Sequence, residues 1–245
     1  MSPELKRRLR KWLWPLMPGW VDEGRRLVQG APLQALLNRA ARAHRFPCVF
    51  NAGSGEGGYS PLLLKLPGVE SVVESDLGLR DHQPNRIDAK QVFFCASLAS
   101  IPLPDRKFNL ILCTEVLEHI QEHEQALDEI ARVMAPGGWL LITVPTPPAP
   151  PDPAHVRDGY RPEELSDMLT QRGFDIIETR FCMHYFFRFL FKNWSRMPWR
   201  PRILIRGLAV LDQLFPLGPP MDLMILAQLT AEKSAPVRSL TRQEA

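Results

Sequence analysis

A glycine-rich segment and an acidic residue downstream of it are the strongest ligand-binding candidates in this chain. The segment runs from Asn51 to Gly58 (NAGSGEGG) and directly follows a short apolar stretch. Glycines at this spacing let the backbone turn tightly and pass close beneath a ligand, although an ordinary glycine-rich turn is the alternative. Asp76 ends the stretch VVESD, 23 residues after Gly53, where a carboxylate can accept hydrogen bonds from both hydroxyls of a ribose. We favour Asp76 over Glu74 for this role because it stands at the tip of the strand; a solvated acid at a strand end is the alternative.

A second group consists of Glu115, Glu118 and His119, which form an E-x-x-E-H pattern. Positions i, i+3 and i+4 share one face of a helical turn. Two carboxylates and one imidazole on one face could bind a divalent cation. A capping and packing role at the start of the following helix is the favoured interpretation. We therefore predict no metal ion, and Glu115, Glu118 and His119 are the set that would hold one.

A third polar group, AHVRDGY, follows a proline-rich loop. His155 could act as a general base because its free pKa lies near neutrality, and Arg157 could bind an anionic group. The alternative is that the segment only caps a helix that opens at Pro162. The candidate catalytic residues are His155, His119 and Tyr160.

The elements that must position these residues alternate between strands and helices. We expect strands at 48–50, 69–75, 91–95, 108–113, 139–144, 174–182 and 221–229. We expect helices at 4–16, 32–44, 59–66, 121–135 and 162–172, the second of them beginning at Pro32. Alternating strands and helices predict an α/β fold with a parallel sheet. Ligands of such a sheet bind at the carboxyl ends of its strands.

Charge is distributed unevenly along the chain, whose net charge is +3. Residues 1–20 carry +4 and residues 181–220 carry +5, whereas residues 21–180 carry −6. An acidic body without a basic track argues against nucleic acid as a partner. No apolar run approaches about 18 residues, so we expect no transmembrane helix. Four scattered cysteines without a C-x-x-C pair predict a reduced, intracellular protein.

Five blocks of this sequence, taken together in their order and spacing, resemble the class I S-adenosylmethionine-dependent methyltransferases, and within them the type 11, ubiquinone-biosynthesis-like group of small-molecule enzymes. The blocks are VFNAGSGEGG (49–58), VVESD (72–76), IPLPDRKFNLILCTEVLEHI (101–120), ARVMAPGGWLLITVP (131–145) and EELSDMLTQRGFDIIE (163–178). The resemblance implies a Rossmann-like, doubly wound sheet of seven strands, mostly parallel with an antiparallel last strand. It also implies S-adenosylmethionine as the cofactor.

The resemblance further implies a role for each matching residue. Gly53 and Gly55 would lie under the methionine part of the cofactor, and Asp76 would hold the ribose. Residues 97 and 98 would flank the adenine, and residues 114 and 115 would border the transferred methyl group. The implied set is Asn51, Ala52, Gly53, Ser54, Gly55, Asp76, Leu77, Ser97, Leu98, Thr114 and Glu115. Asn51 and Ser97 replace acids that the family usually has, and their oxygens can still accept hydrogen bonds. We expect weaker cofactor binding and not its loss.

We expect four parts in the chain. They are basic amphipathic helices (1–45), a methyltransferase domain (46–184 and 221–231), a basic aromatic helical insert (185–220) and a flexible tail (232–245). The insert could form a lid or a membrane contact. More generally, the basic segments could pack on the body, contact a membrane surface through 4–16 and 185–215, or form an oligomer interface.

We therefore expect transfer of a methyl group to oxygen or carbon of a small-molecule, lipid-linked or glycan-linked acceptor. The expected location is the cytoplasm, at the inner face of a membrane if the basic segments touch lipid. A nucleotide-dependent oxidoreductase is disfavoured by the G-x-G-x-G spacing and the E-V-L-E-H block. The remaining alternative is a non-catalytic protein that keeps the fold as a membrane-associated or scaffolding module.

Overall fold

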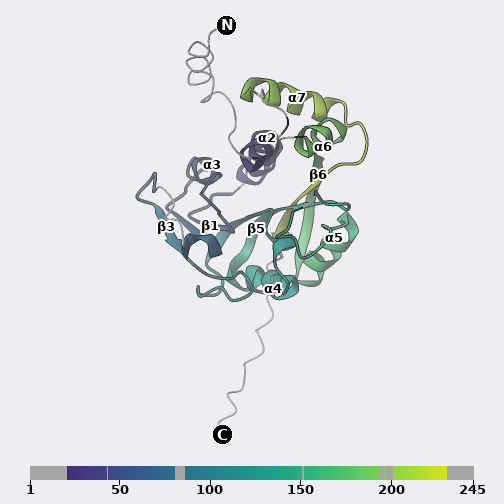
Figure 1. Cartoon of the computed structure of the whole chain (residues 1–245). Helices are drawn as coiled ribbons and strands as arrows, with labels where there is room; N and C mark the ends of the chain where they lie inside the picture. The colour runs from purple at the N-terminus through teal and green to yellow at the C-terminus, as the bar shows by residue number, and fades with distance from the viewer. Residues whose placement is uncertain are drawn as a thin grey trace.

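Seven strands of the described residues form one central sheet with helices on both of its sides (Figure 1). The computed structural model describes residues 21–42, 44–80, 86–150, 152–193, 196 and 201–230. The strands are β1 (Cys48–Ala52), β2 (Ser71–Ser75), β3 (Gln91–Phe94), β4 (Phe108–Thr114), β5 (Met134–Pro145), β6 (Phe174–Cys182) and β7 (Asp222–Leu229). Their order is β3-β2-β1-β4-β5-β7-β6, and β7 runs antiparallel to both of its neighbours. This arrangement confirms the expected fold class.

The register of the central strands brings the candidate ligand-binding segments to one edge of the sheet. Ala52, at the end of β1, is paired with Ser75 of β2 and with Cys113 of β4. The chain therefore leaves all three strands at the same level. The glycine-rich segment, Asp76 and Glu115 follow directly after these three ends. This edge is where an α/β sheet places its ligand.

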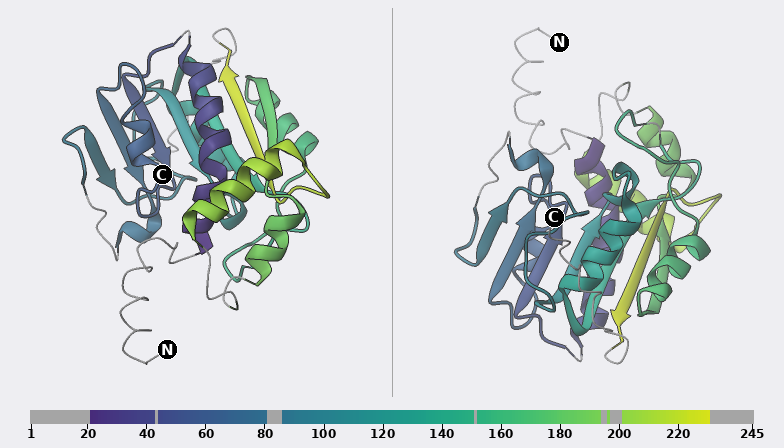
Figure 2. Two further views of the ribbon diagram at one scale, coloured as in Figure 1. Left: turned by 90° about the horizontal axis from the view of Figure 1, so that it is seen from above. Right: turned by 90° about the horizontal axis from the view of Figure 1, so that it is seen from below.

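Helices cover the two sides of the sheet in separate layers (Figure 1). One side carries α4 (His123–Val133) and α5 (Pro162–Gln171), and the other carries α2 (Val21–Ala41), α3 (Ser60–Leu63), α6 (Tyr185–Lys192) and α7 (Arg202–Leu214). Figure 2 shows α7 crossing over α2 on the side away from α4. Successive strand residues point to opposite sides, so Phe50 joins a core with Leu127, and Val49 joins a core with Leu36 and Ile205.

The start of α2 differs from the prediction. The helix begins at Val21 and contains Pro32 in its interior, whereas the sequence analysis has a helix beginning at Pro32. An internal proline costs about 3 kcal/mol, but each fully buried apolar side chain gains about 1.5–3 kcal/mol. Val28 before the proline and Leu33 and Leu36 after it are buried in the same core. Burial on both sides of Pro32 therefore keeps the helix continuous.

Two other element boundaries also differ. The strand β5 begins at Met134 and not at Trp139, because Met134 pairs with Phe108 and a register irregularity between Phe108 and Leu110 carries the strand through Pro136-Gly137-Gly138. The helix α3 spans only Ser60–Leu63. The expected helix at 4–16 and the tail at 232–245 lie outside the described residues. Among the described residues, none of the helices has both the length and the apolar character needed to cross a bilayer.

Candidate active site

A cavity of about 470 Å³ opens at the carboxyl ends of β1, β2 and β4. Nine of the residues that the resemblance assigns to the cofactor line it, and they come from four separate segments of the chain. They are Gly53, Ser54, Gly55, Asp76, Leu77, Ser97, Leu98, Thr114 and Glu115. Asn51 and Ala52 are buried behind the cavity and do not line it. The fold thus collects residues that are far apart in sequence around one space.

The glycine-rich segment forms the floor of this cavity, and its two central glycines do different things. Gly53 has φ +72°, and a Cβ atom there would lie 2.3 Å from Cγ2 of Val116. Packing therefore requires a glycine at this position. Gly55 has φ +52°, and a Cβ atom there would meet no atom within 4 Å. The open space above Gly55 is what a backbone that passes close beneath a ligand requires.

The two competing carboxylates of β2 have different surroundings. Glu74 is fully buried and accepts hydrogen bonds from Asn51 Nδ2 (3.1 Å), Ser60 Oγ (2.8 Å) and Gln91 Nε2 (2.7 Å). It therefore ties β1, α3 and β3 together. Asp76 lines the cavity and accepts hydrogen bonds from the backbone N–H groups of Gly55 (2.8 Å) and Gly78 (2.7 Å). The geometry favours Asp76 as the carboxylate that contacts a ligand, and ribose binding stays a prediction.

Comparison with known proteins identifies the domain that carries this cavity. Residues 50–142 match the model of a family described as "Methyltransferase domain". A probable S-adenosylmethionine-dependent methyltransferase of Mycolicibacterium smegmatis is 28% identical over 147 residues, which are 56% of this chain and 55% of that protein. A malonyl-[acyl-carrier protein] O-methyltransferase of Chlorobium luteolum is 32% identical over 133 residues, which are 49% of each chain. Residues 50–142 thus match a class I, type 11 methyltransferase domain over somewhat less than half of the chain.

Solved structures agree with this assignment at the level of the fold. An S-adenosylmethionine-dependent methyltransferase of Mesorhizobium loti has a TM-score of 0.53 and 18% identity, covering 79% of this chain and 95% of that one. The [4+2]-cyclase SpnF has a TM-score of 0.56 and 17% identity, covering 81% of each chain. S-adenosylmethionine is the cofactor that the methyltransferase family implies. The matched regions span about half the length of the curated relatives named above, so the activity of the whole protein is a proposal.

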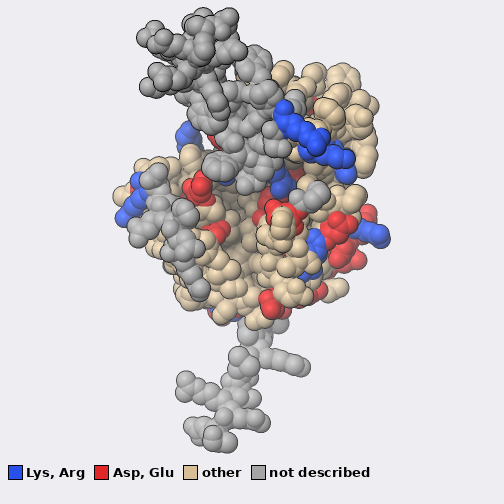
Figure 3. All heavy atoms as spheres, viewed as in Figure 1, with Lys and Arg blue, Asp and Glu red and all other residues tan. Residues whose placement is uncertain are grey.

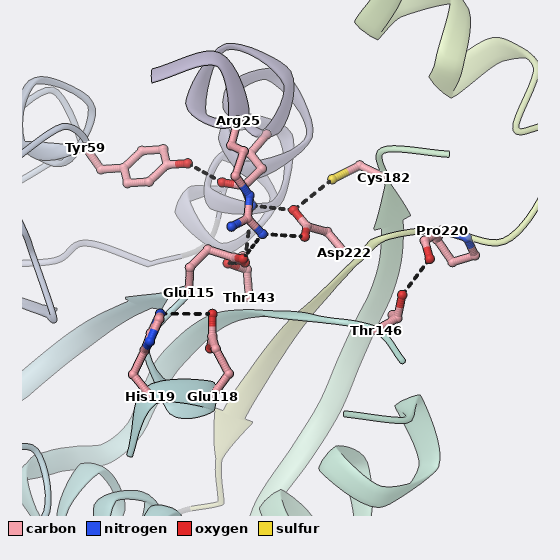
Figure 4. A network of polar contacts seen from close by, with 11 residues as sticks. Arg25, Tyr59, Glu115, Glu118, His119, Thr143, Thr146, Cys182, Pro220 and Asp222 are labelled. Carbon is pink, nitrogen blue, oxygen red and sulfur yellow. Dashed lines mark hydrogen bonds and ion pairs between the residues drawn. The ribbon is translucent and has the colours of Figure 1, made fainter. Parts of the chain in front are cut away.

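Four further polar residues stand at or next to the cavity, and they are Arg25, Gln29, Tyr59 and Asp222. Figure 4 shows Arg25, Tyr59 and Asp222. Arg25 of α2 pairs with Glu115 and, at 3.2 Å, with Asp222 of β7. Gln29 donates to Asp222 and accepts a hydrogen bond from Tyr59 Oη at 2.7 Å. Arg25 and Gln29 are spaced i, i+4, which places them on one helical face. That signal was missed because the helix was expected to begin only at Pro32.

The buried charges in this group are unbalanced, because the single guanidinium of Arg25 faces two carboxylates. Asp222 is fully buried. Burial, followed by the charge of Glu115, raises the pKa of Asp222 to about 7. Burial opposes the charge of Arg25, but the two carboxylates raise its pKa above the usual range. Glu115 has φ +54°, an uncommon conformation for a residue other than glycine, and its Oε1 accepts a 2.8 Å hydrogen bond from Thr143 Oγ1. Strained backbone of this kind is typical of functional sites.

The E-x-x-E-H pattern divides in two in the structure (Figure 4). Glu115 turns to Arg25, whereas Glu118 is fully buried. His119 Nε2 lies 3.8 Å from Glu118 Oε1, and neither carboxylate oxygen of Glu118 has a donor at hydrogen-bond distance among the described residues. Burial, followed by the charge of Glu115, raises the pKa of Glu118 to about 9. Ligand atoms of Glu118, His119 and His155 lie within 4.8 Å of one another. The residues that could hold a divalent cation are therefore Glu118, His119 and His155, and the set that includes Glu115 does not fit.

The three catalytic candidates are placed at different depths. His119 lines the cavity, and its Nδ1 lies 3.1 Å from the carbonyl oxygen of Ala154. The ring of His155 lies behind it, with the ring centroids 4.7 Å apart. Burial, followed by the neighbouring His119, lowers the pKa of His155. Tyr160 is fully buried, and its hydroxyl group contacts His123 Nδ1 at 2.9 Å. The structure therefore does not bring the Tyr160 hydroxyl to the cavity.

Two neighbouring side chains, Arg157 and His123, make contacts that the sequence did not indicate. Arg157 Nη2 donates to the backbone carbonyls of Ile120 (2.7 Å) and Gln121 (3.3 Å), so this guanidinium holds the loop after β4. His123 is half-buried and packs against Tyr160. Both side chains join the segment 154–160 to the turn that carries Glu118 and His119. They thereby fix the outer wall of the cavity.

Proposed function

We propose that this protein transfers a methyl group from S-adenosylmethionine to an oxygen or carbon atom of a small-molecule acceptor. The observation that carries the proposal is the cavity at the ends of β1, β2 and β4, where the open space over Gly55 lies beside the Asp76 carboxylate. The family match to residues 50–142 supports the same reaction class. The likeness to a [4+2]-cyclase at 17% identity shows the fold alone, so an experiment on cofactor binding is needed.

The residues present fit the cofactor. Gly53 and Gly55 would lie beneath it, Asp76 would accept hydrogen bonds from its ribose, and Ser97 and Leu98 would border its adenine. The cofactor would supply a methyl group on a positively charged sulfur, which is already electrophilic. The protein must therefore mainly align the acceptor and exclude water.

For a hydroxyl acceptor, the proton acceptor in this proposal is His119. The carbonyl oxygen of Ala154 accepts a hydrogen bond from Nδ1, so the hydrogen of the neutral ring resides on Nδ1. Nε2, which lies 3.8 Å from Glu118 Oε1, is then the nitrogen that would take the proton. His155 packs against this ring and holds its plane. A proton acceptor is needed for oxygen acceptors, whereas transfer to an activated carbon does not require one from the ring.

Calorimetric titration with S-adenosylmethionine tests the proposal through one pair of variants. Gly55→Ala adds a methyl group that projects into the open space of the cavity. Gly137→Ala is the matched control, because Gly137 also has a positive φ (+74°), has no atom within 4 Å of its Cβ position and does not line the cavity. We expect Gly55→Ala to weaken binding about tenfold or more, and Gly137→Ala to leave it unchanged.

The wild-type protein provides the decisive arm of this titration. Binding of S-adenosylmethionine but not of NAD is the expected result. Absence of S-adenosylmethionine binding by the folded protein would overturn the proposal and favour a non-catalytic role. Equal weakening by the two alanine variants would mean that backbone strain, and not contact with the ligand, explains the effect.

We further propose that the acceptor is linked to a lipid or a glycan. The body of the protein is acidic whereas residues 181–220 carry +5, which suits an acceptor linked to a lipid or glycan at a membrane surface better than a nucleic acid. A panel of hydrophobic hydroxylated compounds and their glycosylated forms, assayed by transfer of a labelled methyl group, tests this choice. Transfer only to water-soluble compounds without a lipid or sugar portion would contradict it.

A further inference from the structure

The helical insert between β6 and β7 carries most of the exposed apolar side chains. Of the fifteen large apolar side chains that are exposed among the described residues, ten lie between 185 and 217. We call these ten the insert face; they are Tyr185, Phe186, Phe189, Ile203, Leu204, Val210, Leu211, Leu214, Phe215 and Leu217. Apolar side chains scattered singly need no explanation, but a concentration of this kind marks an interaction surface.

Helix geometry shows that this exposure is systematic. On α7, Ile205, Ala209 and Asp212 point inward at i, i+4 and i+7. The opposite stripe consists of Ile203, Val210 and Leu214, whose exposed fractions are 82%, 55% and 65%. On α6, Phe187 and Leu190 are buried while the three aromatic members of the insert face point outward. Each helix therefore has one apolar side for the core and a second one for something outside the chain.

Hydrogen bonds join the start of α6 to α7 and to the loop after it, so the outer sides of the two helices make a single surface. His184, just before α6, contacts Asp212 of α7 through its backbone N–H (3.0 Å) and its Nδ1 (3.0 Å). The backbone N–H of Tyr185 donates to the carbonyl of Leu217 at 2.9 Å. The end of α7 and the middle of the loop after it are thus held to the start of α6. The insert face does not depend on a chance arrangement of separate segments.

The charges around the insert face identify what it contacts. Residues 185–220 contain six Lys or Arg residues and one acid, Asp212, and Asp212 is buried against His184. Exposed basic side chains include Lys192, Arg196 and Arg206. Figure 3 shows largely uncharged surface over α6 and α7, with Lys and Arg side chains along one edge. Apolar surface with a basic edge and no exposed acid complements an anionic lipid surface.

We propose that the insert face docks on an anionic lipid bilayer, with the basic side chains of α6 and α7 against the lipid headgroups. This proposal rests on the proposed function only in its explanation of why docking would be useful, and the docking itself can be tested without it. Arg202 of α7 forms an ion pair with Glu23 of α2, the helix that also carries Arg25 of the cavity. The chain runs from the insert directly into Asp222, the partner of Arg25. Docking would therefore hold the cavity close to lipid-embedded acceptors.

Vesicle co-sedimentation of the full chain, without cofactor, tests the docking. The vesicles are phosphatidylcholine alone or phosphatidylcholine with phosphatidylglycerol. We expect binding to the anionic vesicles and a fall of about tenfold in partitioning for Val210→Glu. Val92→Glu is the matched control, because Val92 on β3 is 53% exposed, close to the 55% of Val210, and lies outside the insert face. Its binding should equal that of the wild type.

A second variant tests the charge. Arg206 is exposed and lies one turn from both Ile203 and Val210. Arg206→Gln should lower partitioning into anionic vesicles about fivefold, and the effect should shrink at high salt because exposed charges are screened. Equal binding to neutral and anionic vesicles would overturn the assignment of an anionic bilayer.

Three other outcomes overturn the proposal. One is equal binding of Val210→Glu and Val92→Glu. Another is absence of vesicle binding together with a dimer that Val210→Glu dissociates in sedimentation velocity, which would assign the insert face to a second copy. The third is absence of vesicle binding together with a lower melting temperature of Val210→Glu, which would mean that another part of the chain covers the face. Because no cofactor is added, these results are independent of whether S-adenosylmethionine binds.

Discussion

The helices on the two sides of the sheet bury and expose their side chains in opposite ways. On α4, Leu127 and Ile130 enter the core while Glu124 and Asp128 are exposed. On α7 the single acid is buried and several leucines are exposed. The first pattern is that of a surface helix of a globular domain. The second cannot be explained by stability of the fold, because exposed leucines contribute little to it, so it indicates a contact outside the chain.

Ion pairs on the two sides differ in the same sense. Arg172, beside α4, reaches Glu124 and Asp128, whose carboxylates are largely exposed. Arg25, on α2, reaches Glu115 and the fully buried Asp222. Exposed pairs of this kind contribute about 0–1 kcal/mol, whereas removal of one partner from a buried group has a large effect. The ion pairs on the α4 side therefore contribute little to the fold, whereas those on the α2 side hold the polar groups beside the cavity.

The largest effect that separates the two sides is expected from a pair of leucines. Leu127→Ala on α4 removes a fully buried side chain and should lower the free energy of unfolding by about 2–5 kcal/mol. Leu211→Ala on α7 removes a half-exposed side chain and should change it by no more than about 0.5 kcal/mol. Urea denaturation of both variants measures the difference. A loss above about 2 kcal/mol for Leu211→Ala would show that its surface is part of the core.

The sheet was predictable because its signals are local. Each central strand is a short apolar run between turn residues, and the Gly-rich turn, Asp76 and the E-V-L-E-H block each follow one strand directly. The ends of parallel strands meet at one edge, so the Gly-rich turn and Asp76 could be placed there from the sequence pattern. The other cavity-lining residues, such as Ser97, Leu98 and Thr114, were named only through the resemblance to the methyltransferase family. From the sequence, Asp76 could be preferred over Glu74 only because it stands at the tip of the strand. The structure adds the physical reason, because the Glu74 carboxylate is occupied by hydrogen bonds from three buried side chains.

The parts that were not predictable depend on contacts distant in sequence. Arg25 and Asp222 are 197 residues apart. They meet because Arg25 of α2 reaches Glu115, just after β4, and the first residue of β7, which no local pattern encodes. Pro32 was also taken as the first residue of a helix, so the part of α2 that carries Arg25 was not predicted. Glu118 and His155 come together because the backbone N–H of Val156 donates to the carbonyl of Glu118 at 2.9 Å. The E-x-x-E-H spacing alone suggested Glu115 as the third member of that group.

The next effect in size compares one acid on each side. Asp212→Ala leaves the backbone N–H and the imidazole of His184 without their acceptor. A buried polar group without a partner costs about 1–3 kcal/mol, so we expect a fall of about 2–3 kcal/mol in the free energy of unfolding. Asp128→Ala, which breaks an exposed pair with Arg172 on α4, should cost less than about 1 kcal/mol. Equal losses would remove the distinction between the two sides.

The last comparison concerns pH and the fully buried carboxylate of Asp222, which pairs with Arg25. The pKa of Asp222 rises from 3.8 to about 7 in the folded protein, so the folded state keeps a proton that the unfolded state loses as the pH increases. The contribution of this group to the free energy of unfolding therefore falls between about pH 4 and pH 7 and remains low above that range. Asp222→Asn cannot titrate, so its free energy of unfolding should fall less than that of the wild type over this range. Urea denaturation at a series of pH values measures the two profiles. Parallel profiles for the variant and the wild type would show that Asp222 is ionised throughout this range. In that case Arg25 would stabilise two ionised carboxylates at a buried site, as Arg172 does at an exposed one.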